Sequence, residues 1–497
     1  MKQLDIYQTI GQLVDQAVRV HLIGNEDRIY ARNQVLSLLH LDEFHQSEGT
    51  KTDQDIPDLL DILVQYACEN GIIQDVFDEK EIFASHIMNV FTARPSIVNK
   101  VFWRKYAADP EKATDYFYDL SKNSNYIQMK QIQKNIVYKA PTEYGDLDIT
   151  INLSKPEKDP KSIAREKLAK KGHYPKCLLC MENEGYAGRT GHPARSNHRL
   201  IRLTLGEEPW YFQYSPYVYY NEHCIVLSET HRDMKIDMST FERLLEFVEK
   251  FPHYFLGSNA DLPIVGGSIL SHDHYQGGRY EFAMAKAADD WHFEMKAFPG
   301  LDAAVVKWPM PVIRLRSAET DKLAAAADHI LKVWKGYSDP SVEILAETNG
   351  TPHNTITPIA RKRGGIFELD LVLRNNRTSE VHPLGIFHPH AEVHHIKKEN
   401  IGLIEVMGLA VLPARLKPEL AEVEKYLLGQ PNDIAEYHLD WAQELKRKYG
   451  GAIQMENVQG IVRNEVGKVF LQVLHHAGVF KRDEKGKEAF RKFLQQL

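Results

Sequence analysis

The change in hydrophobic spacing along the chain constrains its fold more than any other feature. Across residues 1–120, apolar side chains recur at three- and four-residue intervals, as at Ile6 and Ile10, which predicts amphipathic helices. Short β-rich runs then begin at residues 135–138 and 147–151, with turn residues between them. Because the two periods occupy separate segments, the sequence predicts an α+β fold.

Later segments repeat this arrangement. We predict a helix at residues 239–251, begun by a capping box of Ser239 and Glu242, and another at residues 321–335. A second β-rich block follows at residues 356–396, which suggests a duplicated α+β unit, and helices return from Lys417 onward. The charged stretch at residues 155–171 is typical of a surface linker that carries one solvated helix.

Composition narrows the class of protein. A net charge of −7 provides no general positive field for a nucleic-acid backbone. No apolar run approaches the roughly 20 residues of a membrane-spanning helix, and the first residues lack the apolar block of a signal peptide. Four cysteines are too few for a disulfide framework in 497 residues. We therefore expect a cytoplasmic protein with small anionic substrates, no nucleic-acid partner and no membrane.

The segment at residues 259–278 is the most informative part of the sequence. If residues 271–276 are extended, His272, His274 and Gln276 project from one face. An imidazole can attack phosphorus when one ring nitrogen keeps its lone pair and the other is held by a hydrogen bond. The alternative is that these are surface histidines, or histidines that only bind a metal.

Neighbouring residues in this segment fit phosphate chemistry. Gly266 and Gly267 would let the backbone N–H groups approach phosphate oxygens. Gln276 can donate a hydrogen bond to a phosphoryl oxygen but cannot protonate a departing alkoxide. The leaving group must therefore be stable without a proton, as a sugar 1-phosphate is.

Cys177 and Cys180 have the two-residue gap found in structural zinc sites. His231 and His272 could complete a Cys2His2 set, in which case zinc would fix the segment that positions His274. The alternative is a redox dithiol or two packed thiols.

A third group of histidines could bind a second metal ion. It contains His353, His394 and His395, together with His388-Pro389-His390. A solvated or locally hydrogen-bonded cluster is the other interpretation.

These residues resemble a known family, the galactose-1-phosphate uridylyltransferases of the histidine-triad superfamily, and in particular its second, mainly bacterial class. The likeness covers nearly the whole chain and includes the segments at residues 27–33, 124–127, 272–276 and 396–408. It implies a ping-pong exchange in galactose metabolism: UDP-glucose uridylylates a histidine and releases glucose 1-phosphate, and galactose 1-phosphate then takes the uridylyl group. The resemblance also implies a homodimer.

The resemblance assigns roles residue by residue. The nucleophile falls on His274, the phosphate-contacting glutamine on Gln276 and the phosphate-side serine on Ser268. An asparagine that helps to hold the nucleotide falls on Asn259, and uracil contacts fall on Leu178 and Leu179. The zinc ligands of the family's first class match Cys177, Cys180, His231 and His272. The chain departs from that class at Asp273, where the class has proline, and the hexose contacts do not map onto residues 402–408.

The predicted architecture is two histidine-triad-like halves with antiparallel sheets and a helical N-terminal extension. The regions are residues 1–122 (helical), 123–345 (first half, with the nucleophile and zinc ligands), 346–430 (second half) and 431–497 (helical). Two rival functions remain: a dinucleoside polyphosphate phosphorylase or another nucleotidyl transferase, and a zinc-stabilised nucleotide-binding module without turnover.

Overall fold

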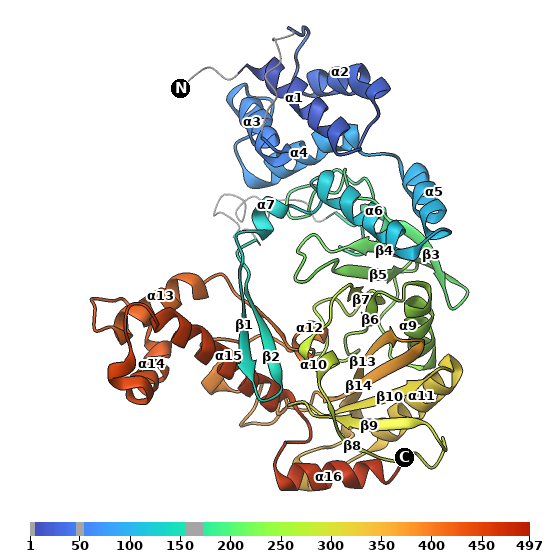
Figure 1. The fold of residues 1–497 in the computed structure, drawn as a ribbon, viewed down its shortest axis with the longest axis vertical. Helices are drawn as coiled ribbons and strands as arrows, with labels where there is room; N and C mark the ends of the chain where they lie inside the picture. The colour runs from blue at the N-terminus through green and yellow to red at the C-terminus, as the bar shows by residue number, and fades with distance from the viewer. Residues whose placement is uncertain (1–4, 46–53, 155–171) are drawn as a thin grey trace. The chain divides into compact units, whose positions relative to one another are not determined.

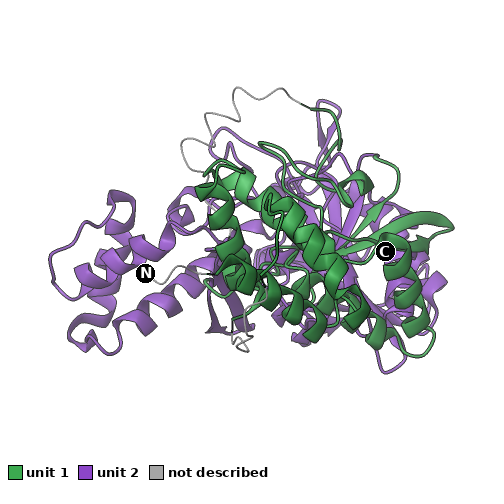
Figure 2. Ribbon diagram, turned by 90° about the horizontal axis from the view of Figure 1, so that it is seen from above, with its two compact units in different colours: residues 1–134, 154–218, 222–231 green, residues 135–153, 219–221, 232–497 purple. Residues whose placement is uncertain are grey.

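The structure is a computed structural model that describes residues 5–45, 54–154 and 172–497. It separates into two compact units (Figure 2). Unit 1 comprises residues 1–134, 154–218 and 222–231, and unit 2 comprises residues 135–153, 219–221 and 232–497. The predicted linker at residues 155–171 lies outside the described residues. The predicted region boundaries at 122, 345 and 430 stay predictions.

Unit 1 begins with helices that share one apolar core, among them α1 (Ile6–Arg19), α2 (Arg28–Leu38), α3 (Ile56–Glu69) and α4 (Phe77–Phe91). Side-chain caps fix where two of them start, because the Asp5 carboxylate accepts the Tyr7 N–H at 3.0 Å and the Asp55 carboxylate accepts the Asp58 N–H at 3.1 Å. The predicted helical N-terminal region is confirmed.

A small antiparallel sheet completes unit 1. Its strands are β3 (Ile201–Leu205), β4 (Glu208–Tyr214) and β5 (Cys224–Ser228), and the unit also contains α5 (Pro95–Tyr106), α6 (Pro110–Asn123) and α7 (Met129–Ile132). Phe117 of α6 lies edge-on to Phe212 of β4, with ring centroids 5.5 Å apart. This aromatic contact anchors the helices to the sheet.

Unit 2 contains a larger antiparallel sheet in the order β7-β6-β13-β14-β10-β9-β8. Its strands are β6 (Phe255–Gly257), β7 (His274–Gly278), β8 (Asp289–His292), β9 (Asp302–Val306), β10 (Val312–Ser317), β13 (Asn354–Arg363) and β14 (Ile366–Asn375). Helices α9 (Met238–Lys250) and α11 (Thr320–Gly336) pack along it (Figure 1). The short pair β11 (Glu347–Thr348) and β12 (Thr351–Pro352) stands apart.

A second layer of unit 2 joins the β1–β2 hairpin to the C-terminal helices. Strands β1 (Ile136–Thr142) and β2 (Gly145–Ile151) are antiparallel, whereas β15 (Leu409–Leu412) runs parallel to β2. The helices of this layer are α10 (Ala283–Lys286), α12 (Leu403–Val406), α13 (Leu416–Leu427), α14 (Glu436–Tyr449) and α15 (Val458–Ala477). Helix α16 (Glu484–Leu494) packs instead beside the larger sheet, where the rings of Phe493 and Trp334 of α11 lie 5.2 Å apart.

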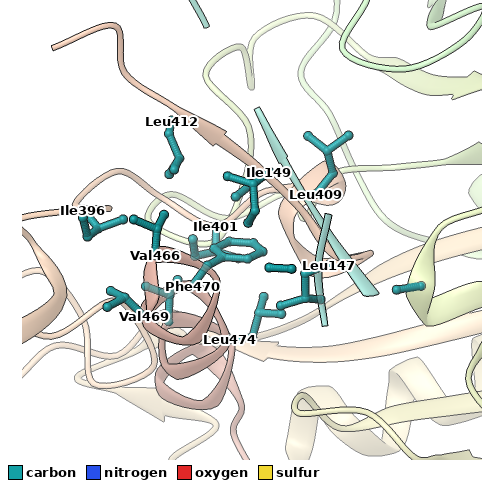
Figure 3. Packing of buried hydrophobic residues seen from close by; sticks show 14 of the residues in the cluster. Leu147, Ile149, Ile396, Ile401, Leu409, Leu412, Val466, Val469, Phe470 and Leu474 are labelled. Atoms are coloured by element: carbon teal, nitrogen blue, oxygen red, sulfur yellow. The ribbon is translucent and has the colours of Figure 1, made fainter. Parts of the chain in front are cut away.

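Helix α15 approaches the hairpin closely. Phe470 of α15 is fully buried among Leu147, Ile149 and Ile401 (Figure 3). A Cβ atom at Gly467 would overlap that of Ala140 in β1, so glycine is needed for this approach despite its cost within a helix.

The α+β class with antiparallel sheets is confirmed, with the β2–β15 pair as a parallel exception. Within the described residues, no helix is both long and apolar enough to cross a membrane.

A buried ionic network fixes the register of the larger sheet. Asp370 on β14 is fully buried and accepts two hydrogen bonds from Arg314 on β10, at 2.7 and 3.0 Å, and one from Arg361 on β13. Burial alone would raise the pKa of the Asp370 carboxyl, but the two guanidinium groups outweigh it and hold the pKa well below its usual range. The carboxylate therefore stays charged and binds three adjacent strands together.

We expect Asp370→Asn to lower the free energy of unfolding by about 3–5 kcal/mol, because two buried cations lose their shared counter-charge. Urea unfolding followed by intrinsic fluorescence measures the effect. Asp146→Asn, at an exposed position in β2, is the matched control and should unfold at the wild-type midpoint. An unchanged midpoint for Asp370→Asn would show that the network does not stabilise the sheet.

Candidate active site and metal ligands

Strand β7 positions the predicted nucleophile. It begins at His274, and Gln276 pairs with Gly257 of β6. The prediction that the extended segment starts at residue 271 is wrong by three residues, so His272 and Asp273 precede the strand. Because side chains alternate along a strand, His274 and Gln276 share one face of β7.

The hydrogen bond of the His274 ring defines its tautomer. Nδ1 lies 2.7 Å from the backbone carbonyl oxygen of His272. A carbonyl oxygen can only accept a hydrogen bond, so Nδ1 carries the ring proton and Nε2 carries the lone pair. The ring is 6% exposed, and burial lowers its pKa to about 4. At neutral pH, His274 is therefore an uncharged imidazole with a nucleophilic Nε2.

The two residues before His274 are also buried. The His272 side chain is fully buried, and Asp273 is 5% exposed. Burial raises the pKa of the Asp273 carboxyl to about 6, and Arg232, which donates from Nε to Asp273 Oδ2 at 3.3 Å, opposes that shift. No sequence pattern pointed to Arg232.

The loop before β7 depends on its glycines. A Cβ at Gly266 would lie 2.5 Å from the carbonyl oxygen of Ala260 and 2.6 Å from that of Leu262, so no larger residue fits. Ile264 adopts φ of 74°, a conformation that strains a β-branched side chain. Ser268, also in this loop, is exposed.

Asn259 joins this loop to a distant segment of unit 2. It is 3% exposed, and its Oδ1 accepts the N–H of Leu403, the first residue of α12, at 2.9 Å. A Cβ at Gly267 would come within 2.9 Å of Asn259 Nδ2, so the amide lies directly against that glycine. The sequence did not predict that Leu403 would lie here. The only local signal was the capping pattern of Gly402 and Glu405, whose carboxylate accepts the Gly402 N–H at 3.2 Å.

Three of the four predicted metal ligands gather in unit 1. The Sγ atoms of Cys177 and Cys180 are 3.5 Å apart, and Cys180 Sγ lies 3.1 Å from His231 Nδ1. The loop is held in place by Asn183, whose side-chain amide donates to the carbonyl oxygens of both cysteines at 2.8 Å. The fourth predicted ligand, His272, belongs to unit 2.

The electrostatics of these thiols fit a metal better than a redox pair. All four cysteines are free thiols. Burial, followed by the adjacent Cys177 thiol, raises the pKa of Cys180 to about 12. A reactive dithiol needs a lowered pKa, whereas a bound cation would itself make the thiolate favourable.

The two predicted uracil contacts differ in exposure. Leu178 is 46% exposed and Leu179 is 6% exposed. Leu178 therefore presents apolar surface to the solvent, whereas Leu179 is buried.

The third histidine group is hydrogen-bonded. His353 uses both ring nitrogens, with Asn376 Oδ1 at 2.9 Å and Thr348 Oγ1 at 3.0 Å, and His394 Nε2 donates to the Pro389 carbonyl at 2.8 Å. These contacts favour the locally hydrogen-bonded interpretation over a second metal at His353 and His394.

A neighbouring group of His390, Glu392 and His476 brings three ligand atoms within 4.8 Å of one another. However, the rings of His390 and His476 stack with centroids 4.3 Å apart and planes 17° apart. Imidazole lone pairs lie in the ring plane, so one ion cannot lie in both of these nearly parallel planes. The arrangement is a ring stack between the loop after β14 and α15.

Comparison with known proteins covers nearly the whole chain. The model of the galactose-1-phosphate uridyl transferase N-terminal domain matches residues 21–233, and the model of its C-terminal domain matches residues 246–443. Galactose-1-phosphate uridylyltransferase of Clostridium perfringens is 53% identical over 490 residues, which cover 98% of each chain. The Latilactobacillus sakei protein of the same name is 55% identical over 479 residues, which cover 95% of each chain.

Among solved structures, yeast Ap4A phosphorylase Apa2 aligns with 76% of this chain and 94% of its own, at 11% identity and a TM-score of 0.35. A score this low supports no argument about fold or activity. The sequence matches are the stronger result. Two adjacent family models, and relatives more than half identical over nearly their full length, confirm the resemblance noted in the sequence. The chain belongs to the galactose-1-phosphate uridylyltransferase family.

Proposed function

We propose that this chain transfers a uridylyl group from UDP-glucose to galactose 1-phosphate and yields glucose 1-phosphate and UDP-galactose. The printed names of its full-length relatives support the overall reaction. The observation that carries the mechanism is the hydrogen bond from His274 Nδ1 to the His272 carbonyl, which leaves the Nε2 lone pair available to phosphorus.

In the first half-reaction, Nε2 of His274 forms a bond to the α-phosphorus of UDP-glucose. The bond from that phosphorus to the bridging oxygen breaks, and its electron pair leaves with glucose 1-phosphate. In the second half-reaction, a phosphate oxygen of galactose 1-phosphate attacks the same phosphorus, and the P–N electron pair returns to Nε2. Neither step needs a proton, because each leaving group is already stable.

The other proposed contacts follow from this chemistry. Gln276 donates its amide to a phosphoryl oxygen and cannot act as a general acid. Backbone N–H groups at Gly266 and Gly267 and the hydroxyl of Ser268 face the phosphates. Asn259 contacts the nucleotide in addition to holding Leu403, and the uracil packs on the Leu178–Leu179 segment.

We further propose that Cys177, Cys180, His231 and His272 bind zinc. The thiols of Cys177 and Cys180 and the ring of His231 lie together in unit 1, and a Cys2His2 set is typical of structural zinc. Bound zinc would supply fixed geometry to the residues that precede β7, rather than Lewis-acid catalysis.

A homodimer is proposed from the family resemblance alone. A cytoplasmic location is proposed from that resemblance and from the four free thiols.

We expect UDP-glucose alone to convert the protein to an acid-labile adduct one uridylyl group heavier, and His274→Ala to abolish both adduct and exchange. Intact-protein mass spectrometry in trapping conditions measures the first effect and a coupled assay the second. His292→Ala, at an exposed histidine of β8, is the control and should keep both. Normal turnover by His274→Ala would refute the mechanism, and an adduct formed equally well from adenine nucleotides would favour the phosphorylase rival.

The lowered pKa of His274 sets a pH dependence. The neutral imidazole is the nucleophile, and protonation removes its lone pair. With a pKa of about 4, the single-turnover rate of adduct formation should stay constant from about pH 8 to pH 6 and fall as the pH drops toward 4. A rate that halves near pH 6.5, the ordinary histidine pKa, would show that the ring is not desolvated as described.

We expect Cys180→Ser to lose most of the bound zinc, because the set falls to three ligands and loses a thiolate. Elemental analysis of the purified protein gives the zinc content per chain. Cys68→Ser, at a thiol of α3 outside the group, should retain the wild-type content. Equal zinc in the two variants would contradict the assignment.

A further inference from the structure

Two segments of unit 2 are joined directly before the nucleophile. The Asp273 N–H donates to the Arg232 carbonyl at 2.7 Å, and the Met234 N–H donates to the Leu270 carbonyl at 2.8 Å. Residues 270–273 therefore bond to residues 232–234 instead of continuing β7 backwards.

A side-chain bond reinforces this junction. Arg232 Nε donates to Asp273 Oδ2 at 3.3 Å. The Asp273 side chain is 7% exposed and that of Arg232 is 34% exposed, so the carboxylate is buried and the cation reaches it from the surface. The same two residues are thus connected twice, once through the backbone and once through their side chains.

One peptide unit links this junction to His274. The carbonyl of His272 and the N–H of Asp273 belong to the same planar trans peptide, so the two groups point in opposite directions. The N–H is held by the Arg232 carbonyl, and the carbonyl accepts the proton of His274 Nδ1 at 2.7 Å. Rotation of this peptide plane would break both hydrogen bonds. The Arg232 carbonyl, which holds the Asp273 N–H, therefore also fixes the His272 carbonyl that accepts the proton of His274.

We propose that Arg232 and Asp273 are positioning residues that hold the His272–Asp273 peptide plane and thereby fix the tautomer and direction of the His274 ring. Neither residue touches the reacting atoms. The proposal deepens the proposed function, because it assigns to an ion pair the orientation on which uridylyl transfer from UDP-glucose depends.

The test is a double-mutant cycle on the zinc-loaded full-length protein, with Asp273→Ala, Arg232→Ala and the combined variant. We expect each single variant to slow single-turnover adduct formation from UDP-glucose roughly 10- to 100-fold, the range for a displaced catalytic group, with little change in KM. The combined variant should be no slower than either single variant, since both remove the same constraint. Arg232→Lys, which keeps the charge, should restore part of the rate.

A tautomer measurement separates positioning from general damage. In ¹⁵N NMR spectra, His274 of the wild-type protein should carry its proton on Nδ1, and Asp273→Ala should show a mixture of tautomers. Lys235→Ala removes an exposed ion pair with Asp237 on the same segment and should match wild type in rate and tautomer.

Additive rate losses in the cycle, or a loss confined to KM, would overturn the proposal. If Asp273→Ala does not fold, Arg232→Ala and Arg232→Lys decide it, because Arg232 is partly exposed. If wild-type protein forms no adduct at all, the proposed function fails, and the NMR comparison still tests the positioning role.

Discussion

The hydrogen bond between His274 Nδ1 and the His272 carbonyl is the interaction on which the proposed mechanism depends. Burial keeps the ring neutral, and the bond decides which nitrogen keeps its lone pair. Much of the surrounding structure fixes this one contact. Strand β7 sets the position of the ring, and the junction with residues 232–234 sets the orientation of the carbonyl that accepts its proton.

The loop before β7, which carries the proposed phosphate contacts, is fixed by close backbone packing. Gly266 is required because two carbonyl oxygens occupy the space that a side chain would need. Gly267 is required because the Asn259 side chain occupies the corresponding space there. Asn259 in turn fixes the start of α12 through Leu403. A strained φ at Ile264 is tolerated because these contacts fix the loop from several sides. The site is thus held by packing within unit 2 rather than by a flexible loop.

Local patterns predicted the N-terminal helices, α9, α11 and the strands β1, β2, β13 and β14, because hydrophobic period is encoded in neighbouring residues. The local patterns failed where a structural feature depends on residues far away in the sequence. Helix α9 begins at Met238 with Asp237 and Thr240 as its capping residues, so the predicted cap of Ser239 with Glu242 is wrong by two residues. The start of β7 was misplaced because residues 270–273 bond to a segment some forty positions earlier. Two contacts have no signature in the sequence, because each joins remote segments: the Arg232–Asp273 pair and the His390–His476 stack. The capping pattern beside Leu403 predicts a helix start but not its contact with Asn259.

The position of the His274 ring proton has a consequence for the proposed uridylyl-histidine intermediate. When Nε2 of a histidine takes a uridylyl group, Nδ1 keeps its proton if it stays hydrogen-bonded to a carbonyl oxygen. The uridylylated ring is then an imidazolium cation. When the P–N bond breaks, this ring leaves as a neutral imidazole. A neutral imidazole is a far better leaving group than an imidazolate anion. In the proposed mechanism, the carbonyl of His272 would therefore orient the attacking nitrogen and would also keep the uridylyl group labile enough for galactose 1-phosphate to remove it.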